Sequence, residues 1–319
     1  MWTFIITTSL CQGIFSLENF RTSDVPLAEF AINPETFLNV TEIICYHGYP
    51  SEEYPVVTED GYILTIFRIP YGRYNGANKG PRPAVLLYHG FLGDAANWIS
   101  NQPSNSLSFI LADAGYDVWL GNSRGNAYSS RHRSLKPSDT KFWEFSFHEM
   151  GYYDIPAVVD FILKKSWQQQ IYYVGHSEGL SIGFIAFSTW PKLAERIKVF
   201  FALAPPSTVT FSRSPVTKLT TFPESLFRSR LDMYSAHAPA GTSVQNGLHW
   251  YQVYNGKLFR AYDYGSKEKN MAKYNQTTPP IYKISEIKIP IAIWTGGKDL
   301  IVDQRDAAIL VSRISNVIY

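Results

Sequence analysis

Cysteine is scarce in this sequence of 319 residues, which contains only Cys11 and Cys45. Cys11 lies in an N-terminal segment that we expect to be removed, and Cys45 is then left without a partner. A disulfide within the mature chain is therefore excluded, and with it the small disulfide-stabilised folds of many extracellular proteins. An apolar core must hold the chain together, and 45% hydrophobic residues provide material for a sizeable one.

The sequence also has no excess of one sign of charge. The 29 Lys and Arg residues nearly balance the 27 Asp and Glu residues, and a net charge of +2 does not indicate binding to nucleic acid or to an anionic membrane surface. The sequence has no Cys/His spacing typical of a metal site and no glycine loop that cradles phosphate, so we predict no metal and no cofactor. The run Gly121-Asn122-Ser123-Arg124-Gly125 lacks the third glycine of the dinucleotide fingerprint and is interpreted as a structured turn.

Long apolar runs are absent except at the N-terminus. Trp2–Phe15 is apolar, and the small residues near its end predict a signal peptide over residues 1–16. No basic residue precedes this run, so a buried N-terminal strand is the alternative. No later run reaches the length of a membrane span. Entry into the secretory pathway would make glycosylation sites of Asn39 and Asn275, each of which begins an Asn-X-Thr sequon.

Short apolar runs alternate with segments of helical periodicity over most of the chain. The expected strands are Pro83–Tyr88, Tyr116–Leu120, a run starting at Ile171, Ile197–Leu203 and Pro290–Trp294, and the expected helices are Thr41–Tyr49, Ser106–Ala114, Asp154–Lys165, Leu180–Trp190 and Val302–Ser315. Val56–Val57 and Tyr62–Ile69 predict an antiparallel hairpin. The alternation predicts an α/β fold with a mostly parallel sheet that is covered on both faces.

The segment 205–288 interrupts this alternation. It contains many Ser, Thr, Tyr and Pro residues and follows a sheet strand, where an insertion would cover the carboxyl ends of the strands. We therefore divide the chain after the signal peptide into a first part of the core (17–204), a cap insertion (205–288) and a return segment of the core (289–319). The last residues, Asn316–Tyr319, turn apolar, which indicates the beginning of a further strand.

The run Gly175-His176-Ser177-Glu178-Gly179 lies between an expected strand and an expected helix. In this context Gly-X-Ser-X-Gly is the nucleophile elbow, a tight turn that presents the serine of a hydrolase. A side chain two residues before or after the serine would collide with the neighbouring strand or helix, which explains the glycines. The same pattern occurs by chance in loops, but the flanking elements favour Ser177 as a nucleophile.

A second loop, His89-Gly90-Phe91-Leu92-Gly93, directly follows an expected strand. In a hydrolase with a nucleophile elbow, this loop supplies one N–H of the oxyanion hole, and the residue after the nucleophile supplies the other. We therefore predict the backbone amides of Phe91 and Glu178 as the two oxyanion donors. For the side chain of His89 we predict a structural role that braces the loop.

A third loop, after the strand Pro290–Trp294, carries Asp299. The acid of a catalytic triad follows the serine in this fold and orients the imidazole of the base, so we predict Asp299 as the charge-relay acid. Asp303 and Asp306 are interpreted as acids favoured by the dipole at the start of the following helix.

A histidine after Asp299 is missing. All the histidines precede Asp299: His47, His89, His132, His148, His176, His237 and His249. The elbow is expected to turn the His176 side chain away from that of Ser177, and His237 and His249 are expected on the surface of the cap. A serine without its base is a poor nucleophile, and loss of a triad histidine lowers turnover by on the order of 10⁶. We therefore expect these 319 residues alone to have little or no activity.

Several motifs together closely resemble the acid lipases of animals, the gastric and lysosomal acid lipase family of α/β-hydrolases. They are Gly48-Tyr49-Pro50, Thr58-Glu59-Asp60-Gly61-Tyr62-Ile63-Leu64, His89-Gly90-Phe91-Leu92, Gly121-Asn122-Ser123-Arg124-Gly125-Asn126, Phe142-Trp143, Gly175-His176-Ser177, Pro239-Ala240-Gly241-Thr242-Ser243 and Gly297-Lys298-Asp299. The resemblance covers nearly all of residues 30–319. It implies an α/β-hydrolase fold and a glycoprotein, secreted or in the lysosomal lumen. It also implies hydrolysis of triacylglycerols or other lipid esters at an interface through an acyl-serine intermediate.

Three departures from the family pattern bear on function. The family usually has glutamine at the position of Glu178, and a carboxylate beside a developing oxyanion would slow the reaction. The cap is shortened around Phe227-Arg228, where the cap cysteines of the family are missing. The family's closing strand, histidine loop and last helix would lie beyond Tyr319, which would leave Pro290–Trp294 as an apolar edge strand prone to aggregation.

Two other functions stay open at this point. The fold can serve as a lipid-binding or interaction protein without a working triad, although such a scaffold need not keep an intact elbow. The same chemistry can also act on a soluble ester. The aromatic residues of the cap mildly favour a lipid substrate: Trp250, Tyr251, Tyr254, Phe259, Tyr262 and Tyr264. The sequence does not predict an oligomeric state.

Overall fold

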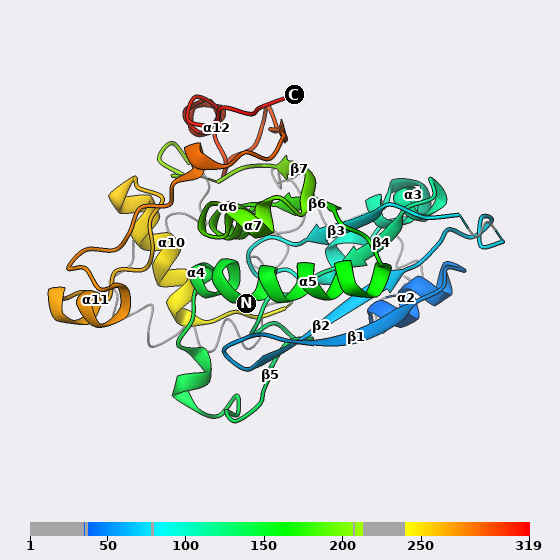
Figure 1. The fold of residues 1–319 in the computed structure, drawn as a ribbon, viewed down its shortest axis with the longest axis horizontal. Coiled ribbons are helices and arrows are strands. Elements are labelled where there is room, and N and C mark those ends of the chain that lie inside the picture. Colours follow the sequence, from blue (N-terminus) through cyan, green and yellow to red (C-terminus); the bar gives the residue numbers. More distant parts are fainter. Residues whose placement is uncertain (1–34, 36–37, 78–79, 207, 213–239) are drawn as a thin grey trace, which may run out of the picture.

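A computed structural model of the chain describes residues 35, 38–77, 80–206, 208–212 and 240–319. The predicted signal peptide and the predicted shortening of the cap lie outside these residues. Within them the strands form one sheet in the order β1-β2-β4-β3-β6-β7-β8, and β5 pairs with β2 (Figure 1). The strands are β1 (Glu52–Val57), β2 (Tyr62–Ile69), β3 (Ala84–Tyr88), β4 (Asp117–Leu120), β5 (Arg131–His132), β6 (Ile171–His176), β7 (Ile197–Leu203) and β8 (Ile291–Trp294).

Strand direction follows the prediction. The strands β4, β3, β6, β7 and β8 are parallel to their neighbours. The helices that connect them bring the chain back to the same end of the sheet, so each strand begins there. β1 and β2 form the expected antiparallel hairpin, and β2 is antiparallel to β4. The sheet is therefore mostly parallel, and the predicted α/β class is confirmed.

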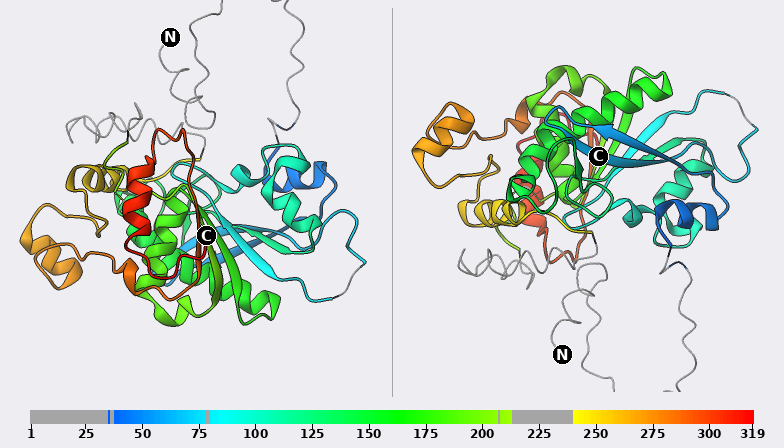
Figure 2. Two further views of the ribbon diagram at one scale, coloured as in Figure 1. Left: turned by 90° about the horizontal axis from the view of Figure 1, so that it is seen from above. Right: turned by 90° about the horizontal axis from the view of Figure 1, so that it is seen from below.

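Helices cover both faces of the sheet (Figures 1 and 2). They are α2 (Val40–Tyr46), α3 (Leu107–Asp113), α4 (Phe147–Glu149), α5 (Ile155–Ser166), α6 (Glu178–Thr189), α7 (Pro191–Ala194), α10 (Val244–Gly256), α11 (Lys267–Tyr274) and α12 (Gln304–Val311). Alternation along β3 shows the two layers. Leu86 and Tyr88 join the core beneath α5 and α6, whereas Val85 and Leu87 join the core beneath α2 and α3.

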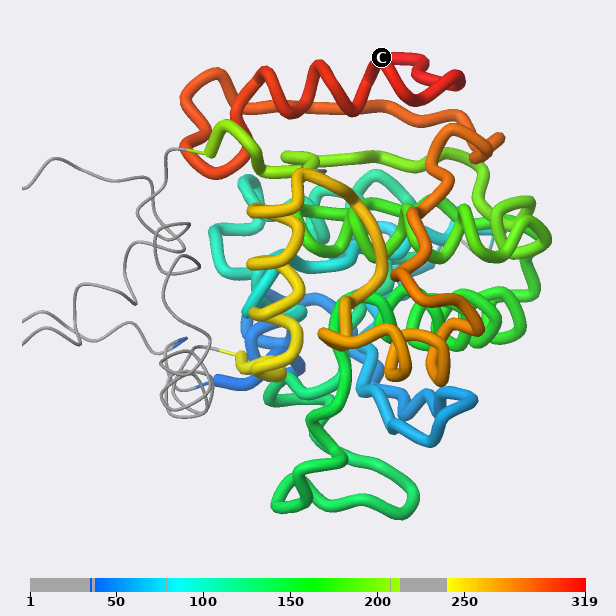
Figure 3. The backbone as a smooth tube through the Cα atoms, turned by 90° about the vertical axis from the view of Figure 1, so that its left-hand side faces the viewer, coloured from blue at the N-terminus to red at the C-terminus, as the bar shows by residue number. Residues whose placement is uncertain are grey.

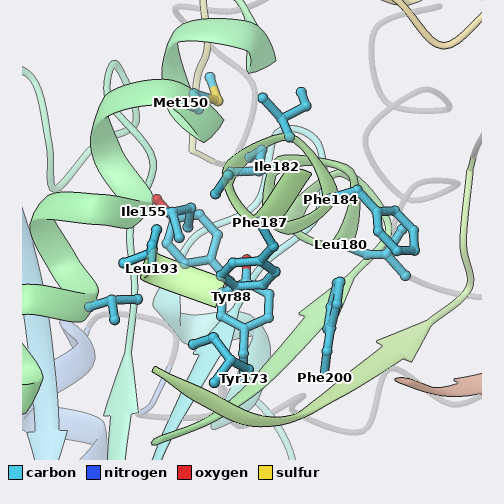
Figure 4. Packing of buried hydrophobic residues seen from close by; sticks show 14 of the residues in the cluster. Tyr88, Met150, Ile155, Tyr173, Leu180, Ile182, Phe184, Phe187, Leu193 and Phe200 are labelled. Carbon is cyan, nitrogen blue, oxygen red and sulfur yellow. The ribbon is translucent and has the colours of Figure 1, made fainter. Parts of the chain in front are cut away.

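The helix α6 is buried on nearly all sides, and every residue from Glu178 to Phe187 is buried. Its apolar side chains pack on Tyr88, Tyr173 and Phe200 of three neighbouring strands (Figure 4). Buried aromatic rings contribute large apolar areas, so this cluster holds α6 rigidly against the middle of the sheet. The position of the predicted nucleophile, at the start of α6, is fixed by this packing.

The edge of β8 differs from the expectation. We expected β8 to be an unpaired edge strand, but residues 316–319 lie beside it in parallel, with Val317 opposite Ile291. The amides of Ile291 and Ile293 donate to Asn316 and Tyr319, at 2.9 and 2.7 Å. The prediction of a bare edge is therefore wrong at these residues, while the expected strand-like character of Asn316–Tyr319 is confirmed.

The described part of the cap segment contains α10 and α11, which lie at one end of the sheet (Figures 1 and 3). Ser243 caps the N-terminus of α10 by accepting a hydrogen bond from the amide of Asn246. In the part of the chain that the structure describes, no helix has both the length and the apolar character needed to cross a membrane.

Candidate active site

Ser177 occupies the turn between β6 and α6. Its backbone has φ 50° and ψ −119°, a combination that residues with a side chain rarely adopt. Such a conformation costs on the order of 1–3 kcal/mol and persists only where the surrounding structure enforces it. Here the Ser177 amide donates to the carbonyl of Leu203 at 2.9 Å, which fixes the turn to the end of β7. The predicted nucleophile therefore lies on a strained turn at the carboxyl end of a central strand.

The two glycines of the motif make this turn possible. A Cβ atom on Gly175 would lie 2.6 Å from the Cα of Leu180 in α6. A Cβ atom on Gly179 would lie 2.5 Å from the carbonyl oxygens of Tyr88 and His89, at the end of β3. Both contacts are with backbone atoms, which cannot rotate away. The predicted reason for the glycines is confirmed.

We expect Gly179→Ala to lower the free energy of unfolding by about 1–3 kcal/mol, because α6 must move away from β3 to admit the methyl group. Urea denaturation measures this change. Gly256→Ala is the matched control, since the nearest atom to its added Cβ would be 4.0 Å away. Equal stability of the two variants would contradict the close contact between α6 and β3.

The loop after β3 lies against Ser177. A Cβ atom on Gly90 would come within 3.1 Å of the Ser177 Cβ, so Phe91 begins next to the nucleophile. Among the described residues, neither the Phe91 amide nor the Glu178 amide has a hydrogen-bond acceptor. Both N–H groups are thus available to a ligand, and the Glu178 amide belongs to the positive end of the α6 dipole. This arrangement is the one that the predicted oxyanion donors require.

His89 supports this loop through hydrogen bonds of its imidazole ring. Its buried imidazole has Nδ1 at 2.8 Å from the carbonyl of Gly90, and its Nε2 accepts from the amide of Ser123 at 3.1 Å. Burial lowers the pKa of His89 to about 4, so the ring is neutral and its proton is on Nδ1. The predicted structural role of His89 is confirmed.

The turn Gly121–Gly125 is held by Arg124, whose side chain is 1% exposed. Its guanidinium binds the Asp154 carboxylate at 2.6 Å and the Asp60 carboxylate at 2.5 Å. Burial alone would lower the pKa of Arg124, but the two carboxylates raise it above its ordinary value. The structured turn predicted for this glycine-containing run is confirmed, and through Ser123 it supports His89 and the Gly90 loop.

Asp299 lies in the loop after β8. Its Oδ1 accepts from the amides of Ile301 and Val302 at 2.8 and 3.0 Å, which fixes the carboxylate. Desolvation lowers the pKa of His176, the residue before Ser177, and the Asp299 carboxylate acts in the opposite direction. Ser177 and Asp299 follow the carboxyl ends of β6 and β8, which run in the same direction, so both residues lie at the same edge of the sheet.

Asp306 has a role that the sequence interpretation missed. Its buried carboxylate accepts from the Thr208 hydroxyl and from the amides of Thr210 and Phe211, at 2.8–2.9 Å. It thus ties the segment after β7 to α12, and does more than face the helix dipole. Asp303, by contrast, caps α12 by accepting from the amide of Arg305, as its position suggested.

Among the described histidines none is hydrogen-bonded to Ser177. Five of them have partners elsewhere: His47 with Glu35, His89 with Gly90, His132 with Asp60, His148 with Tyr282, and His249 with Ser146 and Arg260. The surface position expected for His249 is wrong, because this ring is fully buried and stacks on Phe147 at 3.7 Å between centroids. His237 lies outside the described residues. The described part of the chain also holds no group of acidic, histidine and cysteine residues suited to a metal ion.

The Glu178 side chain points to the cap. Its Oε2 accepts from Nδ2 of Asn246 at 2.9 Å and from Nε1 of Trp250 at 2.5 Å, and both donors belong to α10. Burial raises the pKa of Glu178 to about 7, against the opposite effect of these two hydrogen bonds. The carboxyl is thus engaged with α10, a contact that the sequence interpretation did not foresee.

The two sequon asparagines lie at exposed positions. Asn39 caps α2 with its Oδ1, which accepts from the amide of Glu42, so its Nδ2 stays available for a glycan. Asn275 follows the last turn of α11 with φ 55°.

Comparisons with known proteins agree with this architecture. Residues 40–102 match the family described as "Partial alpha/beta-hydrolase lipase region", and residues 83–227 match the family described as "alpha/beta hydrolase fold". The gastric triacylglycerol lipase of Homo sapiens is 48% identical over 336 residues, which cover 90% of this chain and 84% of that protein. The lysosomal acid lipase/cholesteryl ester hydrolase of Macaca fascicularis is 47% identical, covering 91% of this chain and 85% of that protein. The chain therefore belongs to the gastric and lysosomal acid lipase family of α/β-hydrolases.

Proposed function

We propose that this chain carries the acyl-transfer site of a lipid-ester hydrolase. Ser177 is the nucleophile, Asp299 orients the base, and the amides of Phe91 and Glu178 bind the oxyanion. The observation that carries the proposal is the strained backbone of Ser177 at the start of α6, beside two amides without an acceptor in the described structure. A protein that uses this fold without catalysis would not need this strained conformation.

The reaction follows from these positions. The Ser177 Oγ attacks the ester carbonyl carbon while an imidazole takes its proton, and the carbonyl oxygen becomes an oxyanion between the two amides. Collapse of this intermediate expels the alcohol, which receives the proton, and leaves an acyl-serine. Water then attacks the acyl group by the same route, which yields the carboxylic acid and restores the serine.

The base is the one group that the 319 residues do not supply after Asp299. We propose that no histidine of these 319 residues serves as the base. A fluorophosphonate probe tests the nucleophile: peptide mapping by mass spectrometry should find the slow adduct on Ser177 and on no other serine. Labelling that persists unchanged in Ser177→Ala would contradict the assignment.

We expect hydrolysis of p-nitrophenyl butyrate by the purified 319-residue polypeptide to be no faster than by its Ser177→Ala variant, because a hydroxyl without a base is a poor nucleophile. Initial rates of both proteins, measured at equal concentration and pH, give the comparison. Turnover that depends on Ser177 would show that a base is present within these residues.

The names of the relatives, a triacylglycerol lipase and a cholesteryl ester hydrolase, support a lipid ester as substrate. A soluble ester is the second candidate. The rates of hydrolysis of emulsified and of dissolved esters, measured with imidazole added as the base, distinguish the two. The exposed sequons at Asn39 and Asn275 support passage through the secretory pathway, to the extracellular space or the lysosomal lumen.

A further inference from the structure

The contact between the nucleophile helix and the cap depends on one carboxyl group. Glu178 is the first residue of α6, and its side chain is buried, with the residue 2% exposed. Its Oε2 receives two hydrogen bonds, from Asn246 and Trp250, which lie one turn apart on α10. The same residue therefore contributes its amide to the proposed oxyanion hole and its side chain to the attachment of the cap helix.

The N-terminal half of α10 is attached to α4 at a second place. Oδ1 of Asn246 accepts from the amide of Phe147 at 2.7 Å, and the Ser243 hydroxyl donates to the carbonyl of Phe145. His249 stacks on Phe147 and contacts the Ser146 hydroxyl at 3.0 Å. Asn246 is thus shared by both attachments, so a change at Glu178 reaches the whole N-terminal half of α10.

The charge on Glu178 is not neutralised. The titratable groups on the elements around it include Tyr88 on β3, Tyr173 and His176 on β6, Tyr152, Tyr153 and Asp154 in the turn before α5, His249 on α10, and His148 and Glu149 on α4. Burial raises the pKa of Tyr88 and lowers that of His249 to about 3, so both are neutral at pH 5–8. Burial lowers the pKa of His148, and the Lys273 ammonium pairs with Glu149 at 3.1 Å. Glu178 has amide and indole donors, but no cation, to offset the cost of burying its negative charge.

We propose that Glu178 is a positioning residue, whose carboxyl group seats α10 beside the oxyanion hole firmly when it is neutral and loosely when it is ionised. The proposal rests on the proposed function in placing the oxyanion hole at the Glu178 amide. Lifting α10 exposes the carboxyl to water, where it ionises more readily. Proton linkage then makes opening of α10 easier as the pH rises, since the closed state binds the proton more tightly.

Amide hydrogen exchange of the intact 319-residue protein tests this proposal. Exchange of residues 244–256 is measured between pH 5 and pH 8 and corrected for the intrinsic pH dependence, which gives the opening constant of α10. The carboxyl pKa is about 7 when buried and near 4.5 in water, so the opening constant should rise by on the order of 50- to 100-fold. In Glu178→Gln it should stay constant, because an amide keeps an acceptor for the two bonds and does not titrate.

Glu149→Gln is the matched control, since Glu149 is a buried acid on the adjacent α4. Desolvation raises its pKa, but His148, Lys273 and a hydrogen bond from the Ser146 amide together lower it to about 2. It is ionised throughout this range, so its removal changes the level of the opening constant but should leave the wild-type rise with pH intact. The same pH dependence in the wild type and Glu178→Gln would overturn the proposal, as would an opening constant that falls with pH. Hydrogen exchange does not depend on turnover, so this experiment and the tests of Ser177 as the nucleophile can fail independently of each other.

Discussion

Replacing Arg124 with methionine should lower the free energy of unfolding by about 3–5 kcal/mol, the largest effect that we expect from a single substitution outside the apolar core. The Arg124 guanidinium is buried and binds both Asp154 and Asp60, and the Asp154 carboxylate is itself 0% exposed. Methionine fills much of the volume but leaves the buried Asp154 carboxylate without its counter-charge, with the backbone amide of residue 124 as a remaining donor. Urea denaturation at pH 7 measures the loss.

Two comparisons isolate the cause of this loss. Arg73→Met removes an ion pair with Asp113 whose side chains are both 34% exposed and 3.7 Å apart, and it should cost less than about 1 kcal/mol. Adding Asp154→Asn to Arg124→Met should recover part of the stability, because the unpaired charge is then absent. If the double variant were less stable than Arg124→Met, packing and not charge would explain the effect.

Replacing Glu178 with glutamine should raise the free energy of unfolding at pH 8 by about 3 kcal/mol relative to the change at pH 4.5. The folded chain holds the Glu178 carboxyl at a pKa of about 7, above the ordinary value of 4.5. A group whose pKa is raised by folding contributes its stability below 4.5 and loses it as the pH rises through 7. One pKa unit corresponds to about 1.4 kcal/mol, so the difference between 4.5 and about 7 gives the expected size of the effect.

The measurement is a series of urea denaturation curves for the wild type and Glu178→Gln between pH 4.5 and pH 8. The difference between the two proteins isolates Glu178 from other titrating groups. It should grow with pH and level off above pH 7. A difference that is constant over this range would show that the Glu178 carboxyl keeps its ordinary pKa in the folded chain.

The central strands could be predicted from the sequence because a parallel strand buried on both faces is a continuous apolar run. The observed β3, β4, β7 and β8 therefore lie within one residue of the expected ranges. The helices of the cap segment were not predicted from the sequence. One reason is that α10 has polar residues on both of its faces, and another is that it packs on α4 and α6, which belong to distant parts of the chain.

The helix expected over Asp154–Lys165 is α5, Ile155–Ser166, but the helical turns that precede it were not predicted. Helical structure begins at Phe147 in α4 and passes through a π-helical turn, Met150–Asp154, before α5. A Cβ atom on Gly151 would lie 2.7 Å from the Ile185 side chain, so the turn packs closely on α6. Such a contact between distant segments leaves no periodic signal in the sequence.

Local motifs in the sequence were enough to bring together the segments of the candidate site that lie close to each motif. The elbow glycines and the loop after β3 each place backbone atoms within a few residues of the motif, and the structure brings them together. The Glu178 contacts bridge 68 and 72 residues and could not be read from spacing. One signal was available: a single carboxyl in a helix that is otherwise apolar requires buried partners.

Hydrolysis of p-nitrophenyl butyrate in the presence of added imidazole tests the central claim most directly, since none of the described histidines is hydrogen-bonded to Ser177 and free imidazole can serve as the base. Rates are measured over a range of imidazole concentrations for the wild type, Ser177→Ala and Asp299→Asn. We predict an acceleration in the wild type above that of the Ser177→Ala background, and a smaller one in Asp299→Asn. Identical dependence on imidazole in the wild type and in Ser177→Ala would contradict the account.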